Sequence, residues 1–453
     1  MEMGTVLQRC GLKGSPREGV VMNTTRVAVR RVGSDPVKAV REIFDCFEEI
    51  KSRLRECSSV FIKINGVWHH KHLFTSPEII GAAVRVIRES GPDKKIFIME
   101  NCSQGNFTRH CYAAAGIDKD AKKMGAKCLY LDEEKPVMVT LREGSDERYE
   151  FPGILYRHLV EDRRNAFYLN MPVLKAHCQA QMTAGLKNQM GLLYDEDRAR
   201  HHNRDLHQKI VDIYHFIKPD FTLVDALKVV AGGPMPAGRY VDGLLYDKDL
   251  VFGGTDTVAV DAVAARVLGH DAEKIKHVKL AAEQGLGIAD PDRITLDGEL
   301  PPQEKISWEF QSHLPESINF VIGKEGACFE GCMGHAVQVL ELVVNESHTP
   351  EELEGRPLTI VTGKGFEQEQ LAGLEEPVMV LGKCACEEVL PQVRDSYKVV
   401  DELNTCGHCD NILNIALRRL KVSTFAMSPV SVPKVAFLLV LGKMKGLRYT
   451  FPR

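Results

Sequence analysis

Short apolar runs alternate with amphipathic segments from about residue 38 to residue 300, and this alternation constrains the fold more than any other feature of the sequence. Strands that alternate with helices indicate a parallel sheet covered by helices on both faces. We therefore predict an α/β fold in which ligands bind beyond the carboxyl ends of the strands. The expected strands are 26–30, 60–64, 96–100, 128–131, 167–173, 221–226 and 250–253.

The helix after the second expected strand has a clear start signal in Thr75-Ser76-Pro77-Glu78. This segment combines a hydroxyl cap, a proline in the first turn and an acid near the positive end of the helix dipole. The helix should end near Gly91-Pro92. Further helices are expected at 208–217 and 257–268.

A stretch rich in Pro, Asp and Glu at 290–305 indicates a boundary between two units. We predict an α/β domain over 1–300 and a smaller C-terminal α/β domain over 315–453, separable by proteolysis near 300–315. The expected strands of the second unit are 318–322, 358–361, 378–381 and 398–403.

The overall composition narrows the partners and the compartment. A formal net charge of -4 gives no electrostatic reason to expect nucleic acid. No apolar run reaches the length of a membrane span, and the N-terminal residues lack a secretory signal layout. We therefore expect a cytoplasmic protein with no membrane partner, and the pattern is compatible with an oligomer. In that compartment the thirteen cysteines stay reduced.

Six of those cysteines form three pairs, and each pair follows an expected strand of the second unit. If the strands are parallel, all three pairs emerge at one edge of the sheet. Thiolates are the ligands of iron–sulfur clusters, and nearby glycines would let the backbone approach a bulky inorganic core. We predict these cysteines as metal ligands, with a 4Fe-4S cluster favoured: Cys328, Cys332, Cys384, Cys386, Cys406 and Cys409.

Other interpretations of the pairs remain open. Isolated cysteines are commonly buried small apolar residues. A structural Zn site is the main alternative, although zinc ribbons favour two C-x-x-C knuckles, whereas here three, one and two residues separate the members of the pairs. Six thiols also exceed the four that one cubane cluster uses. The Cys406-Gly407-His408-Cys409 segment fits a redox dithiol as well.

Polar residues gather at the strand ends of the first unit, where they would form an anion-binding pocket. For Asp256 alone, a helix cap is the simpler interpretation. The histidines around 69–72 and 201–207 are interpreted as residues of surface loops. We expect catalysis from His177, Lys175 and Lys187, and substrate binding from Lys63, Asn65, Asn101, Ser103, Asn188 and Asp256.

Several motifs resemble the family known as domain of unknown function 362, whose members are often labelled iron–sulfur center proteins. The resemblance runs from about residue 60 to residue 298 and is carried by K-I-N at 63–65, T-S-P-E-I-I at 75–80, the run from 170 to 191, and G-G-T-D-T-V-A-V-D at 253–261. It implies an α/β fold and a cluster. Ile64 replaces a usual proline, and the ferredoxin-like segment of many relatives is replaced by the dispersed cysteine pairs. The K-A-H…A-G-L-K segment also shows a distant resemblance to nickel-pincer lactate racemases.

These observations favour an iron–sulfur-dependent oxidoreductase that acts on a small anionic substrate in a cationic cleft, with an electron donor protein as a partner. The lysines would bind the anion and His177 would transfer a proton. The alternatives are a non-catalytic metal-handling or electron-transfer protein, and a zinc-stabilised enzyme without redox chemistry. Neither a G-x-S-x-G motif nor a G-K-[ST] phosphate loop is present.

Overall fold

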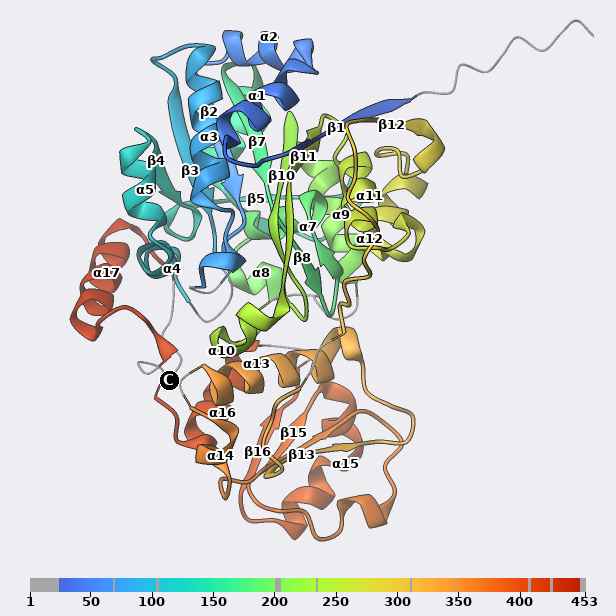
Figure 1. Ribbon diagram of the computed structural model, residues 1–453. Helices are drawn as coiled ribbons and strands as arrows, with labels where there is room; N and C mark the ends of the chain where they lie inside the picture. Colours follow the sequence, from blue (N-terminus) through green and yellow to red (C-terminus); the bar gives the residue numbers. More distant parts are fainter. Residues whose placement is uncertain are drawn as a thin grey trace, which may run out of the picture.

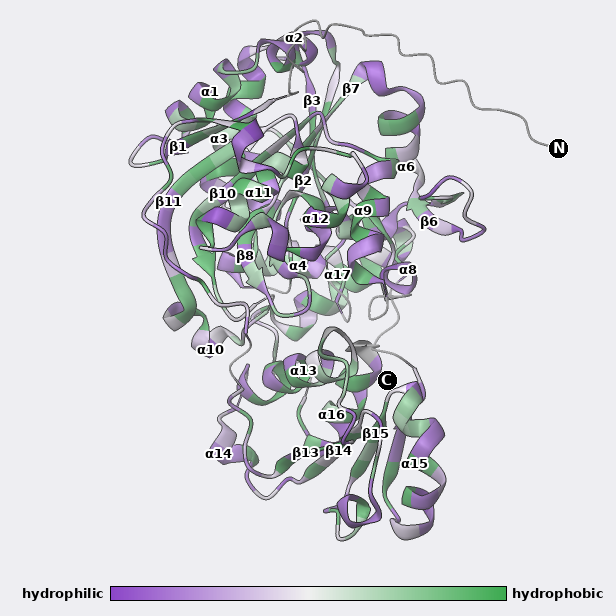
Figure 2. Cartoon of the chain, turned by 90° about the vertical axis from the view of Figure 1, so that its right-hand side faces the viewer, coloured by the Kyte–Doolittle hydropathy of each residue, from purple (hydrophilic) through white to green (hydrophobic). Residues whose placement is uncertain are grey.

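The computed structural model describes residues 24–67, 70–102, 106–199, 205–233, 235–309, 312–346, 348–405, 409–423 and 427–448. These residues form two α/β units, each built on its own sheet, with the first unit above the second in Figure 1. In Figure 2, green hydrophobic segments gather between the layers, whereas the surface helix α2 (Glu48–Glu56) is largely purple. The predicted fold class is confirmed.

The main sheet has ten strands, eight of which follow one another in the order β12-β1-β11-β10-β7-β2-β3-β4. The neighbours from β10 to β4 are parallel, as predicted, but β11 is antiparallel to both β1 and β10. The difference arises because β11 follows β10 through short helical turns rather than a long crossover. The strands are β1 (Thr25–Arg31), β2 (Ser59–Ile64), β3 (Lys95–Glu100), β4 (Lys127–Tyr130), β7 (Ala166–Met171), β8 (Val173–His177), β9 (Gln181–Thr183), β10 (Phe221–Val230), β11 (Leu245–Gly254) and β12 (Ile294–Asp297).

Helices cover both faces of this sheet. One core packs α1 (Pro36–Asp45), α2 and α3 (Pro77–Glu89) against alternate strand residues such as Val60 and Ile62. The other core packs α9 (Leu206–Phe216), α11 (Thr257–Val267) and α12 (Lys276–Glu283) against the opposite face. The two-sided arrangement predicted from the strand–helix alternation is therefore confirmed.

The expected hydroxyl cap of α3 is wrong. Thr75 instead donates to the Met171 carbonyl at 2.6 Å and accepts from the Asn65 amide at 2.8 Å. The Ser76 amide donates to Asp225 at 2.7 Å, so a carboxylate from β10 supports the helix start. These bonds connect the ends of β2 and β7 and the start of α3 with the middle of β10.

The second sheet contains β13 (Ile318–Ile322), β14 (Leu358–Thr362), β15 (Val378–Leu381) and β16 (Val400–Leu403), in that order. All three strand pairs are parallel, as the cysteine hypothesis requires. Helices α13 (Gly334–Asn345) and α16 (Cys409–Leu420) pack on one face, and α15 (Lys383–Ser396) packs on the other.

The segment between the units has no helix or strand in its described residues, 298–309 and 312–317, but its first half packs on the first unit. Ile306 is fully buried in the first core, and Trp308 packs against the ring of His270 with 4.1 Å between centroids. Helix α17 (Val432–Lys445) returns to the first unit and packs on α4 (Thr108–Ala115), at the left of Figure 1. The 315–453 segment is therefore split in space between the two units.

Remaining elements of the first unit lie around this framework. A hairpin of β5 (Pro136–Val139) and β6 (Tyr149–Pro152) projects from it, and short helices α5 (Ile117–Lys123), α7 (Gly185–Asn188), α8 (Asp195–Ala199) and α10 (Gly238–Val241) connect the strands. Among the described residues, no helix has the length and apolar character needed to cross a bilayer.

Candidate anion site and cysteine-bearing edge

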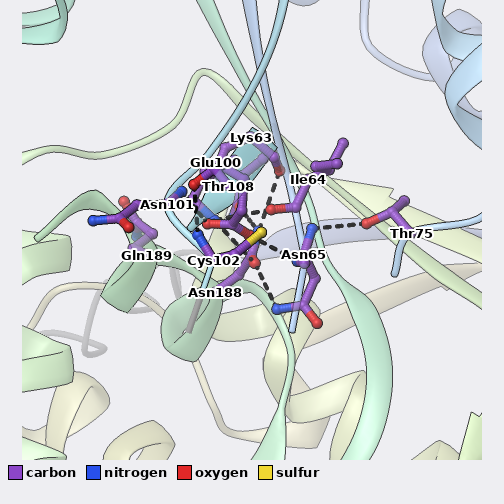
Figure 3. A network of polar contacts seen from close by, with 12 residues as sticks. Lys63, Ile64, Asn65, Thr75, Glu100, Asn101, Cys102, Thr108, Asn188 and Gln189 are labelled. Carbon is purple, nitrogen blue, oxygen red and sulfur yellow. Dashed lines mark hydrogen bonds and ion pairs between the residues drawn. The ribbon is translucent and has the colours of Figure 1, made fainter. Parts of the chain in front are cut away.

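A buried ion pair stands at the carboxyl ends of β2 and β3. The Lys63 ammonium lies 2.7 Å from a Glu100 oxygen, and their side chains are 0% and 2% exposed. Glu100 also accepts from the Gly66 and Asn101 amides, at 2.8 and 2.9 Å. Figure 3 shows this network, in which Lys63 and Glu100 come from adjacent strands. Its position confirms that polar strand ends of the first unit meet.

An amide bridge extends the pair toward α7. The Asn188 oxygen accepts from the Asn65 amide group at 3.0 Å and from Lys63 at 3.4 Å. Its nitrogen donates to the Asn170 oxygen at 2.8 Å. The Asn65 oxygen is buried and has no hydrogen-bond partner within the described residues. A buried acceptor left unpaired is costly, so this position is suited to a ligand or water that donates a hydrogen bond.

Burial disfavours charge on both members of the pair. It lowers the pKa of Lys63 and raises the pKa of Glu100, while the partner's charge opposes each change. Gly191 lies against the pair, since a Cβ there would stand 2.2 Å from a Glu100 oxygen and 2.8 Å from the Lys63 nitrogen. The network is thus closed by close packing as well as by hydrogen bonds.

Two further lysines add positive charge to the same region. Lys175 on β8 is fully buried, and its ammonium donates to the Leu73 carbonyl at 3.2 Å. Burial, followed by repulsion from Lys187, lowers the pKa of Lys175 to about 7. Burial, together with Arg198 and Lys63, lowers the pKa of Lys187 to about 8. Within the described residues the Lys187 ammonium has no hydrogen bond or ion pair.

Arg198 was not predicted as a member of the site. Its guanidinium donates to the carbonyls of Asn101 and Cys102, at 3.0 and 3.2 Å, and pairs with Asp195. The sequence gives no local signal for this role because the arginine lies in a short helix far along the chain from β3. Lys63, Lys175, Lys187 and Arg198 act on one another electrostatically, which makes the region cationic.

His177 ends β8 and is 4% exposed. Its Nδ1 accepts from the amides of Gln179 and Ala180, both at 3.2 Å. Since both partners are donors, Nδ1 carries the lone pair and Nε2 carries the proton of the neutral ring. The turn after β8 therefore fixes one tautomer, in which Nε2–H can donate a hydrogen bond.

The other residues of the first unit that were predicted to bind substrate have different roles in the structure. The side-chain nitrogen of Asn101 donates to the Leu193 carbonyl at 2.9 Å, so it anchors the loop beside the ion pair. Ser103 lies outside the described residues. Asp256 accepts from the amides of Val258, Ala259 and Ile288. The structure thus uses Asp256 as the cap of α11, and the simpler interpretation of this residue holds.

A buried histidine pair was also missed. His277 on α12 is fully buried, stacks on His207 of α9 with 5.6 Å between centroids, and has no hydrogen-bond partner for either ring nitrogen within the described residues. Burial and the charges of His207 and Lys187 hold the pKa of His277 well below its usual value. His207 is 9% exposed, so its interpretation as a surface residue is wrong. Helical spacing in α9 turns it inward, a signal the sequence did contain.

The first two cysteine pairs lie at the carboxyl edge of the second sheet. Cys328 is exposed, Cys332 is buried and Cys384 is half-buried. The Cys332 sulfur lies against Gly382, where a Cβ would stand only 2.7 Å away. Gly382 has a φ of +98° and precedes α15, so a side chain there would be strained and would fill this space.

Cys386 differs from the expectation. It packs with α15 against Val378 and Val380, whereas Cys332 packs with α13 on the opposite face of the sheet. Its sulfur lies 3.6 Å from the Val380 carbonyl, and burial raises its pKa to about 11. The reason is helical geometry, because residues two apart on a helix point to different sides.

The third pair falls largely outside the description. Cys406 lies among residues that the structure does not describe, and for Cys409 the backbone at the start of α16 is described but the side chain is not. Among the described residues, no group of three or more His, Cys, Asp or Glu side chains is arranged to hold a metal ion. The predicted cluster ligands therefore stay a prediction.

The segment from Cys328 to His335, named the cysteine loop, contacts the turn after β8 across the two units. The Gln179 side-chain nitrogen lies 3.0 Å from His335 Nδ1, and His335 contacts the Gly331 carbonyl at 2.8 Å. Gln179 is two residues from His177, and Gly331 is next to Cys332. The proton-carrying histidine and the first cysteine pair are thus connected through a short chain of polar contacts.

The fold and these two sites define an α/β protein with a buried cationic site and a cysteine-bearing second unit. Residues 60–266 match the family model described as Domain of unknown function (DUF362). The chain therefore carries a DUF362 domain, as the motifs indicated, and this domain holds the whole lysine-rich region.

Two more distant likenesses were found. The chain is 26% identical over 228 residues to the thylakoid-associated protein sll1697 of Synechocystis. This alignment covers 48% of this chain and 64% of that relative. The chain thus spans less than two thirds of the relative's length. The lactate racemase apoprotein of Thermoanaerobacterium thermosaccharolyticum aligns with a TM-score of 0.37 and 10% identity, over 85% of this chain and 93% of that one. A likeness at this level carries no argument about function.

Proposed function

We propose that this protein is an iron–sulfur-dependent oxidoreductase, in which the first unit binds a small anionic substrate and the second unit holds the cluster. The observation that carries the proposal is the contact between Gln179 and His335, which places the cysteine loop next to the turn that holds His177. The lysines and Arg198 supply the positive charge that an anion requires.

The cysteines at the carboxyl edge of the second sheet fit a cluster in their chemistry, because thiolates are its ligands. Cys328 and Cys332 follow the parallel strand β13, Cys384 lies in the first turn of α15 after β15, and Gly382 lets the Cys332 sulfur pack directly against the backbone. A cubane cluster uses four thiolates, so Cys406 or Cys409 would complete the set. When bound, the cluster would supply single electrons or Lewis acidity, and a donor protein would supply the electrons.

Residues of the first unit would bind the substrate and stabilise its negative charge. Lys187, which has no hydrogen bond or ion pair within the described residues, would bind an anionic group directly. The unpaired Asn65 oxygen would accept a hydrogen bond from the substrate. The Nε2–H group of His177 would donate a hydrogen bond to the substrate and stabilise negative charge that develops on it, since the Gln179 and Ala180 amides hold that neutral tautomer.

Anaerobic purification followed by iron and sulfide analysis tests the proposal. We expect brown protein with broad visible absorption. The Cys332→Ser variant should lose most of its iron, whereas Cys386→Ser is the matched control and should keep it. Colourless protein that binds stoichiometric zinc, or equal iron in both variants, would contradict the proposal.

One observation favours a second candidate function. Lys63 and Glu100 form an ion pair in which each charge neutralises the other, so part of the buried charge has a structural role. A non-catalytic metal-handling or electron-transfer protein would need only the cysteine-bearing edge. In that case the iron content would follow Cys332, while Lys187→Met would leave the reduction and reoxidation of the protein unchanged.

A further inference from the structure

Helix α17 carries a strongly exposed apolar face. Of the large apolar side chains that are well exposed within the described residues, half lie on this helix: Val432 at 48%, Phe437 at 65%, Val440 at 59% and Met444 at 79%. A single exposed apolar residue is ordinary, but four on fourteen helical residues form a patch.

The opposite face of α17 is occupied. Val435, Leu438 and Leu439 pack with Phe107 of the first unit and with Val430 and Leu447. Gly442 brings the backbone close to this surface, since a Cβ there would stand 2.8 Å from the Leu447 side chain. Figure 1 shows the helix on the outer side of α4. The exposure of the four residues shows that the second apolar face of the helix is turned outward.

The charged residues in the sequence segment that contains α17 are all of one sign. From Asn411 to Arg453 the sequence has eight Lys and Arg residues and no Asp or Glu, although the whole chain carries a net charge of -4. At about 100° per residue, Lys443 falls on one side of the exposed apolar face, and Lys434 and Lys445 fall on the other. Lysines that flank an apolar face can extend their ammonium groups beyond it.

We propose that α17 docks the protein on the surface of an anionic membrane. Its apolar face would insert into the boundary between headgroups and acyl chains, and the flanking lysines would contact lipid phosphates or carboxylates. Fourteen residues span about 21 Å, which is too short to cross a hydrocarbon core of about 30 Å, so the helix lies in the plane of the surface.

A second copy of the chain fits this face less well. Two such helices facing each other would bring lysine borders of like charge together, and one helix face offers less than the roughly 800 Å² per partner of a stable interface. The acids near the helix are also engaged, because Arg109 pairs with Glu133 and Arg448 pairs with Glu150. The expectation of no membrane partner was based on the length of apolar runs, which excludes only helices that span.

Co-sedimentation of the full chain with vesicles tests the proposal. The wild type should bind phosphatidylcholine vesicles that contain phosphatidylserine at least about tenfold more tightly than vesicles of phosphatidylcholine alone. The triple variant Lys434→Gln, Lys443→Gln, Lys445→Gln should bind on the order of a hundredfold more weakly at low salt, at about fivefold per lysine.

The double variant Phe437→Glu, Met444→Glu should stay in the supernatant, and Met444→Glu alone should bind at least about fivefold more weakly. The matched control is Met138→Glu, which changes another exposed methionine, 49% exposed, on the hairpin strand β5 and should bind like the wild type. The proposal would be overturned if the wild type does not bind anionic vesicles or if the double variant binds them like the wild type. It would also be overturned if the wild type is a dimer and the double variant is a monomer.

Discussion

Removal of the buried charge of Lys175 should change the free energy of unfolding, which links the candidate site to the stability of the fold. Its side chain is fully buried, and within the described residues its ammonium has one neutral hydrogen-bond acceptor, the Leu73 carbonyl. The fall of its pKa from 10.5 to about 7 corresponds to about 5 kcal/mol as an upper limit. Substituting Lys175→Met keeps the volume of the side chain and removes the charge.

The sign follows from proton binding. Between about pH 7 and pH 10.5, Lys175 carries its proton more often in the unfolded chain than in the folded protein. The free energy of unfolding of the wild type therefore rises with pH across this window. Below about pH 7 the folded protein must hold a buried charge at full cost. We therefore expect Lys175→Met to stabilise the protein by about 2–5 kcal/mol at pH 6 and by much less at pH 10.

Urea unfolding at pH 6, 8 and 10 measures this difference, with Lys279→Met as the matched control. Lys279 has a side chain that is 48% exposed, so its replacement should change stability by less than about 0.5 kcal/mol at every pH. If the gain from Lys175→Met is the same at pH 6 and pH 10, the lysine is not held near neutrality by burial and the reasoning is refuted.

Two further predictions concern the ion pair of Lys63 and Glu100. Glu100→Gln should destabilise the protein by about 3 kcal/mol, because it leaves a buried lysine without its counter-charge, whereas Asp120→Asn in the exposed pair with Lys123 should cost less than about 0.5 kcal/mol; equal losses in urea unfolding would contradict this. Gly191→Ala should cost about 1–3 kcal/mol, since its Cβ would overlap Glu100, while Gly243→Ala, with no atom within 4 Å of the new Cβ, should not; a neutral Gly191→Ala would show that the network yields easily.

Much of the fold could be predicted from the sequence because the apolar patterns of strands and helices are local. Each strand predicted for the second unit overlaps the observed one, and β13 and β15 have the predicted bounds. The strand β8 was missed because Pro172 interrupts an apolar stretch that was read as one strand. The antiparallel direction of β11 also has no local signal, since it depends on the route of the chain between strands.

The site was only partly readable from the sequence. That the lysines and Asn188 lie near one another could be predicted because polar residues follow strand ends, which parallel strands bring to one edge; their role in a site stays a prediction. Glu100 and Arg198 were missed as partners because their contacts depend on which strands become neighbours. Cys386 was grouped with Cys384 by sequence distance, yet helical geometry turns its sulfur to the other side of the sheet.

Electron paramagnetic resonance of the reduced protein tests most directly whether a cluster and the cationic region form one site. The account predicts a cluster signal in the anaerobic wild type that changes when a small carboxylate or phosphate is added. In Lys187→Met the signal should remain and the change should be lost. Absence of any cluster signal in the wild type, or the same anion-dependent change in Lys187→Met, would contradict the account.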